Sequence, residues 1–257
     1  MVFGWFKSRR RRKLVERPFP DDWVRILAKN FRHWEFLDEQ ERARLGDIIQ
    51  VLVEEKTWQG CGGLELTDEI RVSIAAQAAL LLLGIEHDYY ENVESILVYP
   101  SSYVLPRNQM QEGGVVRDEG VAVLGSAHQR GPVVLSWDSA LGGGRNPYDG
   151  KNVVYHEFAH KLDMLDGMVD GTPELDDAEA FEAWVRVMTA AFEQLQARSS
   201  AGRETLLDAY GATDVGEFFA VATEVFFEKP RQMRSRHPEL YEVLRDFYGQ
   251  DPAARIR

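Results

Sequence analysis

The spacing of hydrophobic positions predicts a mostly helical chain whose strands are confined to its middle. The clearest helical spacing is that of five apolar residues in one segment: Leu45, Ile48, Ile49, Leu52 and Val53. Helices are predicted over 21–36, 38–57, 68–84, 151–165, 176–198, 214–229 and 237–248. Short apolar runs bounded by Gly, Pro and Asn predict strands at 95–99, 115–124 and 132–137. We therefore expect an α+β fold, mostly helical, with a small central sheet.

The most apolar stretch, from Val72 to Ile85, predicts a buried helix rather than a membrane span. It is far shorter than the roughly 20 residues that a span needs, and charged residues bound it on both sides. Thr67, followed by two acidic residues, is expected to cap the start of this helix. We expect no transmembrane segment.

The beginning of the chain differs in composition from the rest. Residues 7–13 carry six positive charges, and charges and prolines follow where a signal peptide needs an apolar run. We expect residues 1–19 to form a basic, disordered tail. The alternative is weak contact of this tail, through its cations and Phe3, Trp5 and Phe6, with an anionic membrane surface or an acidic partner.

No later stretch has the composition of an interdomain linker, so residues 20–257 are expected to form a single domain. Within this domain, the glycine cluster at 60–63 predicts a turn. Residues 142–150, which include three consecutive glycines, form the most flexible-looking segment.

Charge and cysteine content narrow the functional classes. The chain has 30 Lys+Arg against 42 Asp+Glu, a formal net charge of −12, and without its basic tail it is more acidic still. Such a body lacks the clustered cations that phosphate contacts need, so direct nucleic-acid binding is not expected. Cys61 is the one cysteine, which excludes an intramolecular disulfide and a Cys-based zinc cluster and fits a reducing, cytoplasmic location.

The segment 152–163 contains a His-Glu-x-x-His motif formed by His156, Glu157 and His160. Residues four apart lie on one face of a helix, so both imidazoles can point at one metal ion, and neutral imidazole suits zinc. Glu157 is then adjacent to the ion and suited to accept a proton from a metal-bound water, which is the chemistry of peptide-bond hydrolysis. The alternative is a helix with two histidines used for packing, which is costly for a buried pair without partners.

A catalytic zinc needs a third protein ligand, and the predicted helix at 214–229 offers two candidates. After His160 the next histidine is His237, so a carboxylate is expected. Glu217 opens the helix, and Glu224 lies seven residues later on the same face. The helix dipole also favours an acidic residue such as Glu217 at a helix start, and Glu224 also fits a solvated stripe. The pattern leaves these alternatives open.

Three separated motifs carry a resemblance to a known family. They are Gly-Pro-Val-Val-Leu-Ser-Trp at 131–137, His-Glu-Phe-Ala-His-Lys-Leu-Asp at 156–163, and 208–227, which begins Asp-Ala-Tyr. In this order they resemble the Mlc titration factor A family, from about residue 20 to the end. Its members are soluble bacterial zinc peptidases with aminopeptidase activity that also bind the transcriptional repressor Mlc. Their catalytic core is similar to that of the anthrax lethal factor protease, which implies a zincin-like metallopeptidase domain here.

The resemblance also implies roles for single residues. His156, His160 and Glu217 become the ligands of one Zn²⁺ per chain, and Glu157 becomes the general base. Tyr210 precedes Glu217 by seven residues and is implied to donate a hydrogen bond to the oxyanion of the reaction. The alternative for Tyr210 is a packed surface tyrosine.

Two further carboxylates are candidates for the layer behind the metal ligands. Asp163 lies on the face of His156 and is a candidate for holding a ligand imidazole by its second nitrogen, although capping or solvation explains it as well. Glu224 is the other candidate. Some family members have an additional histidine linked to the metal site, but Arg117 occupies the matching place here, and His128 is nearby without being aligned.

The predicted function is therefore that of a zinc-dependent peptidase, and within that class an aminopeptidase. The peptide substrate is expected to bind in extended form along the edge of the strand at 133–137. The resemblance implies a second role in binding an Mlc-like repressor. The alternative is a non-catalytic regulator-binding protein with a structural or vestigial zinc site.

Overall fold

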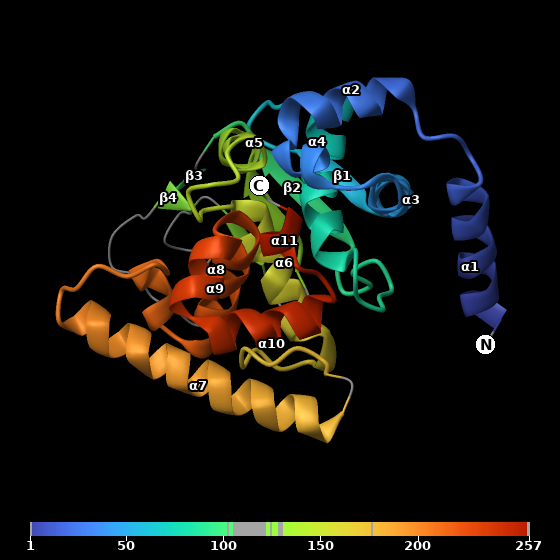
Figure 1. Cartoon of the computed structure of the whole chain (residues 1–257). Helices are drawn as coiled ribbons and strands as arrows, with labels where there is room; N and C mark the ends of the chain where they lie inside the picture. Colours follow the sequence, from blue (N-terminus) through green and yellow to red (C-terminus); the bar gives the residue numbers. More distant parts are fainter. Residues whose placement is uncertain are drawn as a thin grey trace.

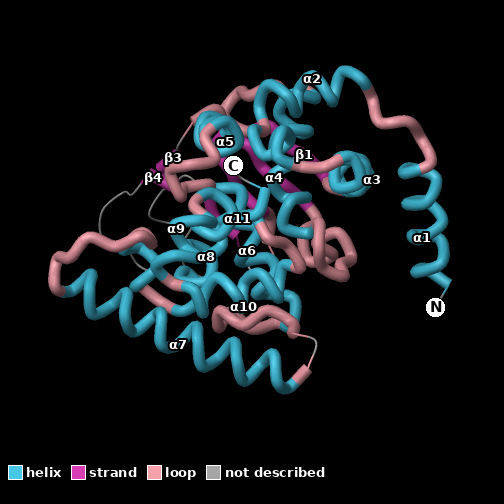
Figure 2. Tube along the Cα trace, viewed as in Figure 1, coloured by secondary structure: helices cyan, strands magenta, loops and turns pink. Residues whose placement is uncertain are grey.

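The computed structural model describes residues 2–101, 103–104, 122–123, 125–127, 131–175 and 177–255. These residues are mostly helical and enclose a small sheet, which confirms the predicted α+β class (Figure 1 and Figure 2). Most of the predicted strand at 115–124, together with Arg117 and His128, lies outside the described residues. Among the described residues, no helix combines the length and the apolar character needed to cross a bilayer.

The helices follow the predicted segments closely in the second half of the chain and less closely elsewhere. In chain order they are α1 (Val2–Val15), α2 (Asp21–Asn30), the 3₁₀ helix η1 (Arg32–Phe36), α3 (Glu39–Glu55), α4 (Asp68–Leu82), α5 (Trp137–Arg145), α6 (Val153–Asp163), η3 (Met164–Asp166), α7 (Ala178–Ser200), η4 (Ala209–Ala212), α8 (Val215–Glu228), α9 (Pro230–Arg236), α10 (Pro238–Tyr248) and α11 (Pro252–Arg255). The predicted helix at 21–36 is thus two elements, because the backbone leaves helical geometry at Phe31.

The main sheet has the strand order β1 (Thr57–Gly60), β2 (Ser95–Tyr99), β6 (Val133–Ser136) and β5 (Gly125–Ala127). The first three strands are parallel, and β5 pairs with β6 in antiparallel register. A separate antiparallel pair is formed by β3 (Tyr103–Val104) and β4 (Ala122–Val123).

The prediction that the strand at 133–137 lies at a sheet edge is wrong, because β6 is paired on both sides. Val133 and Leu135 are fully buried, and a continuous run of apolar residues is typical of such an inner strand. The outermost strand on this side of the sheet is β5, which packs against α6.

The glycine run at 142–144 is helical rather than flexible, since it lies within α5. A Cβ atom on Gly144 would be 2.4 Å from the carbonyl oxygen of Asn30, and one on Gly143 would be 2.9 Å from the Asn152 side chain. The glycines therefore allow α5 to approach the neighbouring backbone closely, which a larger residue would prevent.

Val2–Val15, within the segment expected to be a disordered tail, is the helix α1 in this structure, with Leu14 buried. Lys7 and Arg11 are four residues apart and therefore lie on one face of this helix. They form ion pairs with Asp88, Glu91 and Glu55 on the body of the protein. Figure 1 shows α1 at the periphery, next to α3. The basic residues of α1 therefore have acidic partners that lie far along the chain, and no local sequence pattern reveals them.

Candidate metal centre

The two helices α6 and α8 pack side by side, and each is started by a side-chain cap. The Asn152 side-chain oxygen accepts hydrogen bonds from the backbone N–H groups of Val154 and Tyr155, both at 3.0 Å. At the start of α8, the Asp214 carboxylate accepts from the N–H of Glu217 at 2.9 Å. These caps satisfy donors that helix starts leave free, and they define where the side chains of the first turns point.

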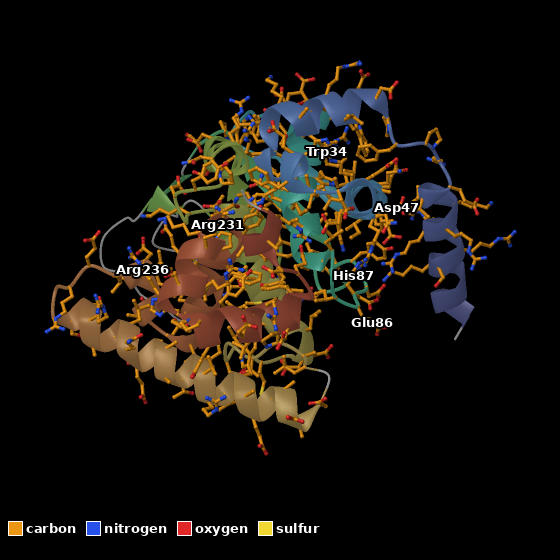
Figure 3. All side chains as sticks on the ribbon, viewed as in Figure 1. Trp34, Asp47, Glu86, His87, Arg231 and Arg236 are labelled. Atoms are coloured by element: carbon orange, nitrogen blue, oxygen red, sulfur yellow. The ribbon has the colours of Figure 1, made fainter. Side chains whose placement is uncertain are left out.

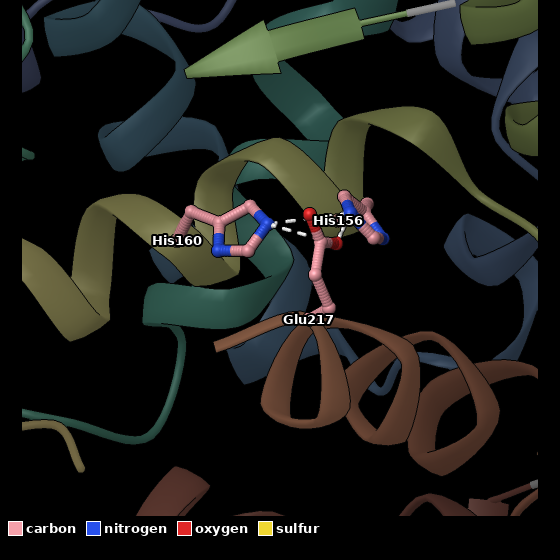
Figure 4. Close-up of side chains that lie close together, drawn as sticks. All are labelled: His156, His160 and Glu217. Atoms are coloured by element: carbon pink, nitrogen blue, oxygen red, sulfur yellow. Dashed lines mark hydrogen bonds and ion pairs between the residues drawn. The ribbon is translucent and has the colours of Figure 1, made fainter. Parts of the chain in front are cut away.

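The structure brings together His156, His160 and Glu217 (Figure 4). The two Nε2 atoms are 3.3 Å apart, and Oε2 of Glu217 lies 3.0 Å from that of His156 and 3.5 Å from that of His160. All three side chains retain some exposure, between 12% and 19%. One donor atom of each residue therefore points at a common position that solvent can reach.

Charge is unevenly distributed within this group. Burial lowers the pKa of His156, but hydrogen bonds to Glu217 and Glu224 outweigh burial and raise the pKa well above its usual value. Burial likewise raises the pKa of Glu217, yet the two imidazoles outweigh it and hold that pKa far below its usual value. The carboxylates therefore stabilise positive charge at the position between them.

Glu224 supports His156 from behind. One carboxylate oxygen lies 2.7 Å from Nδ1 of His156, and the other accepts a hydrogen bond from the backbone N–H of Asn152 at 2.5 Å. The side chain is only 8% exposed. Of the three alternatives that the sequence left open for Glu224, its position fits the supporting carboxylate behind a ligand, and it is not part of a solvated stripe.

Asp163 has a different set of contacts. Its Oδ2 accepts a hydrogen bond from the N–H of Gly171 at 3.1 Å, and burial raises the pKa of this carboxyl to about 6. Among the described residues, both Oδ1 of Asp163 and Nδ1 of His160 are buried without a hydrogen-bond partner. The structure therefore joins Asp163 to the turn after α6 and does not join it to a ligand imidazole.

Glu157, the central residue of the motif, is 5% exposed. Burial raises the pKa of its carboxyl to about 7, and the nearby carboxylates of Glu217 and Glu224 act in the same direction against the two histidines. A carboxyl with a pKa near neutrality can both accept and release a proton at physiological pH.

Tyr210 lies on η4, next to the start of α8. Its hydroxyl donates a hydrogen bond to Oε1 of Glu217 at 2.7 Å, and its ring centroid is 6.0 Å from that of His156. The side chain is 38% exposed, so the hydroxyl group stands at the open side of the cluster. Tyr210 is therefore adjacent to the site and is more than a packed surface residue.

Two buried side-chain amides, those of Asn152 and Gln77, connect this site to the core and were not predicted from the sequence. The Asn152 side-chain amide donates to Oε1 of Gln77 at 2.9 Å, and the Gln77 amide donates in turn to the carbonyl of Ala140 on α5. A signal for the caps was present, because Asn152 directly precedes an apolar helical pattern and Asp214 stands three residues before Glu217. Gln77 had no such signal, since its partners come from distant segments.

Two imidazoles and one carboxylate, with donor atoms within 4.8 Å of one another, form a set that fits a divalent metal ion. The two imidazole Nε2 atoms are 3.3 Å apart, and the surrounding carboxylates favour positive charge beside them. His160 and His156 lie one turn apart on α6, as the motif predicts, whereas Glu217 comes from α8.

This donor set is of the kind that metallopeptidases use, and comparison with known proteins identifies the family. Residues 5–249 match the model of the glucose-regulated metallo-peptidase M90 family. The chain therefore belongs to this family. The match begins at residue 5 and so includes most of α1, which the sequence resemblance had left outside.

Three relatives illustrate the similarity. The "uncharacterized protein slr2042" of Synechocystis sp. is 36% identical over 244 residues, covering 95% of this chain and 89% of that protein. The Mlc titration factor A of Serratia proteamaculans is 34% identical over 226 residues, with coverage of 86% and 84%. That of Escherichia fergusonii is 32% identical over 252 residues, with coverage of 95% and 92%. The resemblance to Mlc titration factor A is thus confirmed across most of the chain.

Proposed function

We propose that the protein is a zinc-dependent aminopeptidase that binds one Zn²⁺ through His156, His160 and Glu217. The single observation that carries the proposal is the convergence of these three donor groups beside the buried Glu157. Neutral imidazole and carboxylate oxygen are ligand types that zinc prefers in catalytic sites. A zinc ion supplies Lewis acidity toward the scissile carbonyl and lowers the pKa of water.

The chain's own residues have separate tasks in this proposal. Glu157 takes a proton from the attacking water and later delivers it to the nitrogen of the leaving amine. Tyr210 donates a hydrogen bond to the oxygen of the scissile carbonyl as negative charge develops there. Glu224 holds His156 in one orientation through Nδ1. The extended peptide is proposed to lie against β5, the outermost strand beside α6.

The central test is the substitution Glu157→Gln, with Glu193→Gln on the exposed face of α7 as the matched control. We expect Glu157→Gln to lower kcat by about 10²–10⁴-fold, because the general base is lost. Metal content, measured by elemental analysis, is expected to stay at the wild-type level. Loss of hydrolysis in both variants, or in neither, contradicts the assigned role. Zinc without turnover in the wild type favours the alternative of a regulator-binding protein with a structural site.

The preference for a free amino terminus is tested by comparing two alanine substrates that differ only at the amino group. Alanine p-nitroanilide has a free amino group, and N-acetylalanine p-nitroanilide does not. We expect hydrolysis of the first and at most slow hydrolysis of the second, since the resemblance implies recognition of a peptide's first residue. Equal rates with both substrates exclude an aminopeptidase.

The substitution Tyr210→Phe distinguishes two possible roles of the Tyr210 hydroxyl. If the hydroxyl acts on the oxyanion, kcat falls by about 10²-fold or more while zinc affinity is retained. If it only orients Glu217, to which it donates in this structure, zinc affinity falls instead. Measurement of both quantities on one preparation distinguishes these results.

A second function is favoured by the names of the relatives from Serratia proteamaculans and Escherichia fergusonii. We propose that this chain also binds a transcriptional repressor of the Mlc type. Binding of purified Mlc, measured by calorimetry, is expected to be equally tight for wild type and Glu157→Gln.

We further propose that residues 20–257 form a single domain and that the protein is cytoplasmic. The solitary Cys61 supports the proposed location.

A further inference from the structure

A cavity of about 400 Å³ lies between the C-terminal part of α7, the segment 204–207, α8 and the start of α10. Its volume is within the range of small-molecule sites. Four buried apolar side chains from four different segments line it: Leu195, Leu207, Phe218 and Leu240. His156, His160 and Glu217 are absent from the lining, so this cavity is separate from the candidate metal centre.

Three nitrogen-rich side chains border the same cavity: Arg198, Arg236 and His237. Arg198 donates to the backbone carbonyl of Glu204 at 2.8 Å, which is a neutral acceptor. Within the part of the chain that the structure describes, neither arginine forms an ion pair, although Glu204 also borders the cavity. Burial, followed by the charges of Arg198 and Arg236, lowers the pKa of His237. The two guanidinium groups therefore act on the same space.

The backbone adds to this positive character. α10 begins with Pro238 after His237, and no side chain caps its first turn. The N–H groups of the first turn, including that of Leu240, which borders the cavity, have no partner within the helix. Free N–H groups and the helix dipole place partial positive charge at this end of α10, which the carboxylate of Glu239 in the first turn offsets in part.

We propose that this cavity binds a small amphipathic carboxylate, with its apolar body against Phe218 and the three leucines and its carboxylate between Arg198 and Arg236. Guanidinium groups are suited to carboxylates because their parallel N–H groups match the two oxygens. The two arginines at this border contrast with the net charge of −12 of the whole chain. The same chemistry is present in a free organic acid and in the carboxyl end of an apolar peptide.

The probes are 4-phenylbutyrate for the free acid and N-acetyl-leucyl-leucine for the peptide end, each compared with its neutral amide. Binding is measured by isothermal titration calorimetry on the full-length, zinc-loaded protein. We expect one of the acids to bind saturably and to bind at least about tenfold more tightly than its amide, because a charge-assisted hydrogen bond is lost in the amide. The acid that binds identifies the source of the carboxylate.

Two variants locate the binding. Arg236→Gln is expected to weaken binding by about tenfold, and the double variant Arg198→Gln/Arg236→Gln to abolish it. Arg231→Gln is the matched control, since this arginine lies on the same helix and does not border the cavity (Figure 3). Thermal unfolding is expected to be unchanged, because these arginines are exposed.

Three results overturn the proposal: no saturable binding of either acid up to about 10 mM, equal binding of acid and amide, or binding that Arg236→Gln leaves unchanged. If binding is insensitive to Arg236→Gln but is lost on treatment with a chelator, the acid occupies the metal centre. That result contradicts this proposal and supports the proposed zinc site, so the two can fail separately.

Discussion

The pair α6–α8 and the helix α1 are attached to the rest of the protein in different ways. A continuous series of contacts runs along α6 and α8 from the buried Gln77 to the exposed Tyr210, in the order Gln77, Asn152, Glu224, His156, Glu217, Tyr210. α1 instead contacts the body through the buried Leu14 and through the ion pairs of Lys7, which is 37% exposed, and of Arg11, which is 13% exposed. The Arg11 guanidinium also lies 4.4 Å from the ring centroid of Tyr89.

This difference indicates which part of the protein has the more precisely defined conformation. Buried hydrogen bonds are costly to break, because the remaining partner stays unsatisfied in a medium of low dielectric constant. Surface ion pairs are exchanged for water at little cost and are screened by salt. The α6–α8 contacts therefore define one geometry at the candidate metal centre, whereas the exposed ion pairs of Lys7 hold the first turns of α1 more weakly.

The largest expected effect on stability is that of Asn152→Ala. This change removes the cap of α6 and leaves Oε1 of Gln77 without its donor, so we expect a loss of about 2–4 kcal/mol in the free energy of unfolding. Chemical denaturation followed by circular dichroism measures it. Asp177→Ala removes an exposed cap of α7 and is expected to cost about 1 kcal/mol. Equal losses in the two variants contradict the importance of the buried network.

Next in size is the effect of Glu224→Gln on metal affinity. The amide cannot accept from both His156 and Asn152 with the strength of a carboxylate, so zinc affinity is expected to fall by about 10–100-fold. Competition with a chelator of known affinity measures it, with Glu193→Gln as the control. An unchanged dissociation constant shows that His156 is oriented without Glu224.

A smaller effect, dependent on pH, is expected for Glu228→Gln at the other end of α8. Burial, followed by the charge of Asp149, raises the pKa of Glu228 to about 9, compared with 4.5 in the unfolded chain. Between these values the folded state holds a proton that the unfolded chain releases, so this group's contribution to stability falls as pH rises. Its replacement by Gln removes that contribution.

The difference in Tm between Glu228→Gln and wild type is therefore expected to increase from pH 5 to pH 9, by at least about 2 °C. The amide oxygen of Gln can still accept from the N–H groups of Gly150 and Lys151, which donate to Glu228 in this structure. Parallel Tm curves for the two proteins across this range indicate that the carboxyl titrates at its ordinary pKa.

The smallest global effect is expected for Arg11→Gln, at about 1 kcal/mol, because its partner Asp88 is 45% exposed and can turn to water, although Glu55 is only 10% exposed. Hydrogen exchange in residues 2–15 is expected to accelerate, and high salt is expected to act in the same direction in the wild type. Arg12→Gln, on the exposed face of α1, is the control. If both variants exchange equally, the ion pairs of Arg11 do not hold α1.

Much of the fold could be predicted because hydrophobic periodicity is local. The helices α6, α7, α8 and α10 lie within about two residues of their predicted bounds. The helices α5 and α9 were not predicted, because glycine and proline usually indicate the end of a helix. In the structure, Gly143 and Gly144 allow close packing of α5, and Pro230 is the first residue of α9. The strand β6 was predicted correctly as a strand and wrongly as an edge, because strand order depends on partners far along the chain.

The sequence by itself determined the spacing of His156, Glu157 and His160, because three residues on one helix have a geometry that helical repeat alone dictates. Tertiary structure alone decided which carboxylate of α8 lies beside both imidazoles and which lies behind one of them. It also decided that Asp163 contacts the turn at Gly171, and that the basic residues of α1 face Glu55 and Asp88. These contacts join segments separated by up to about 80 residues, and only the packing of the whole core fixes their distances.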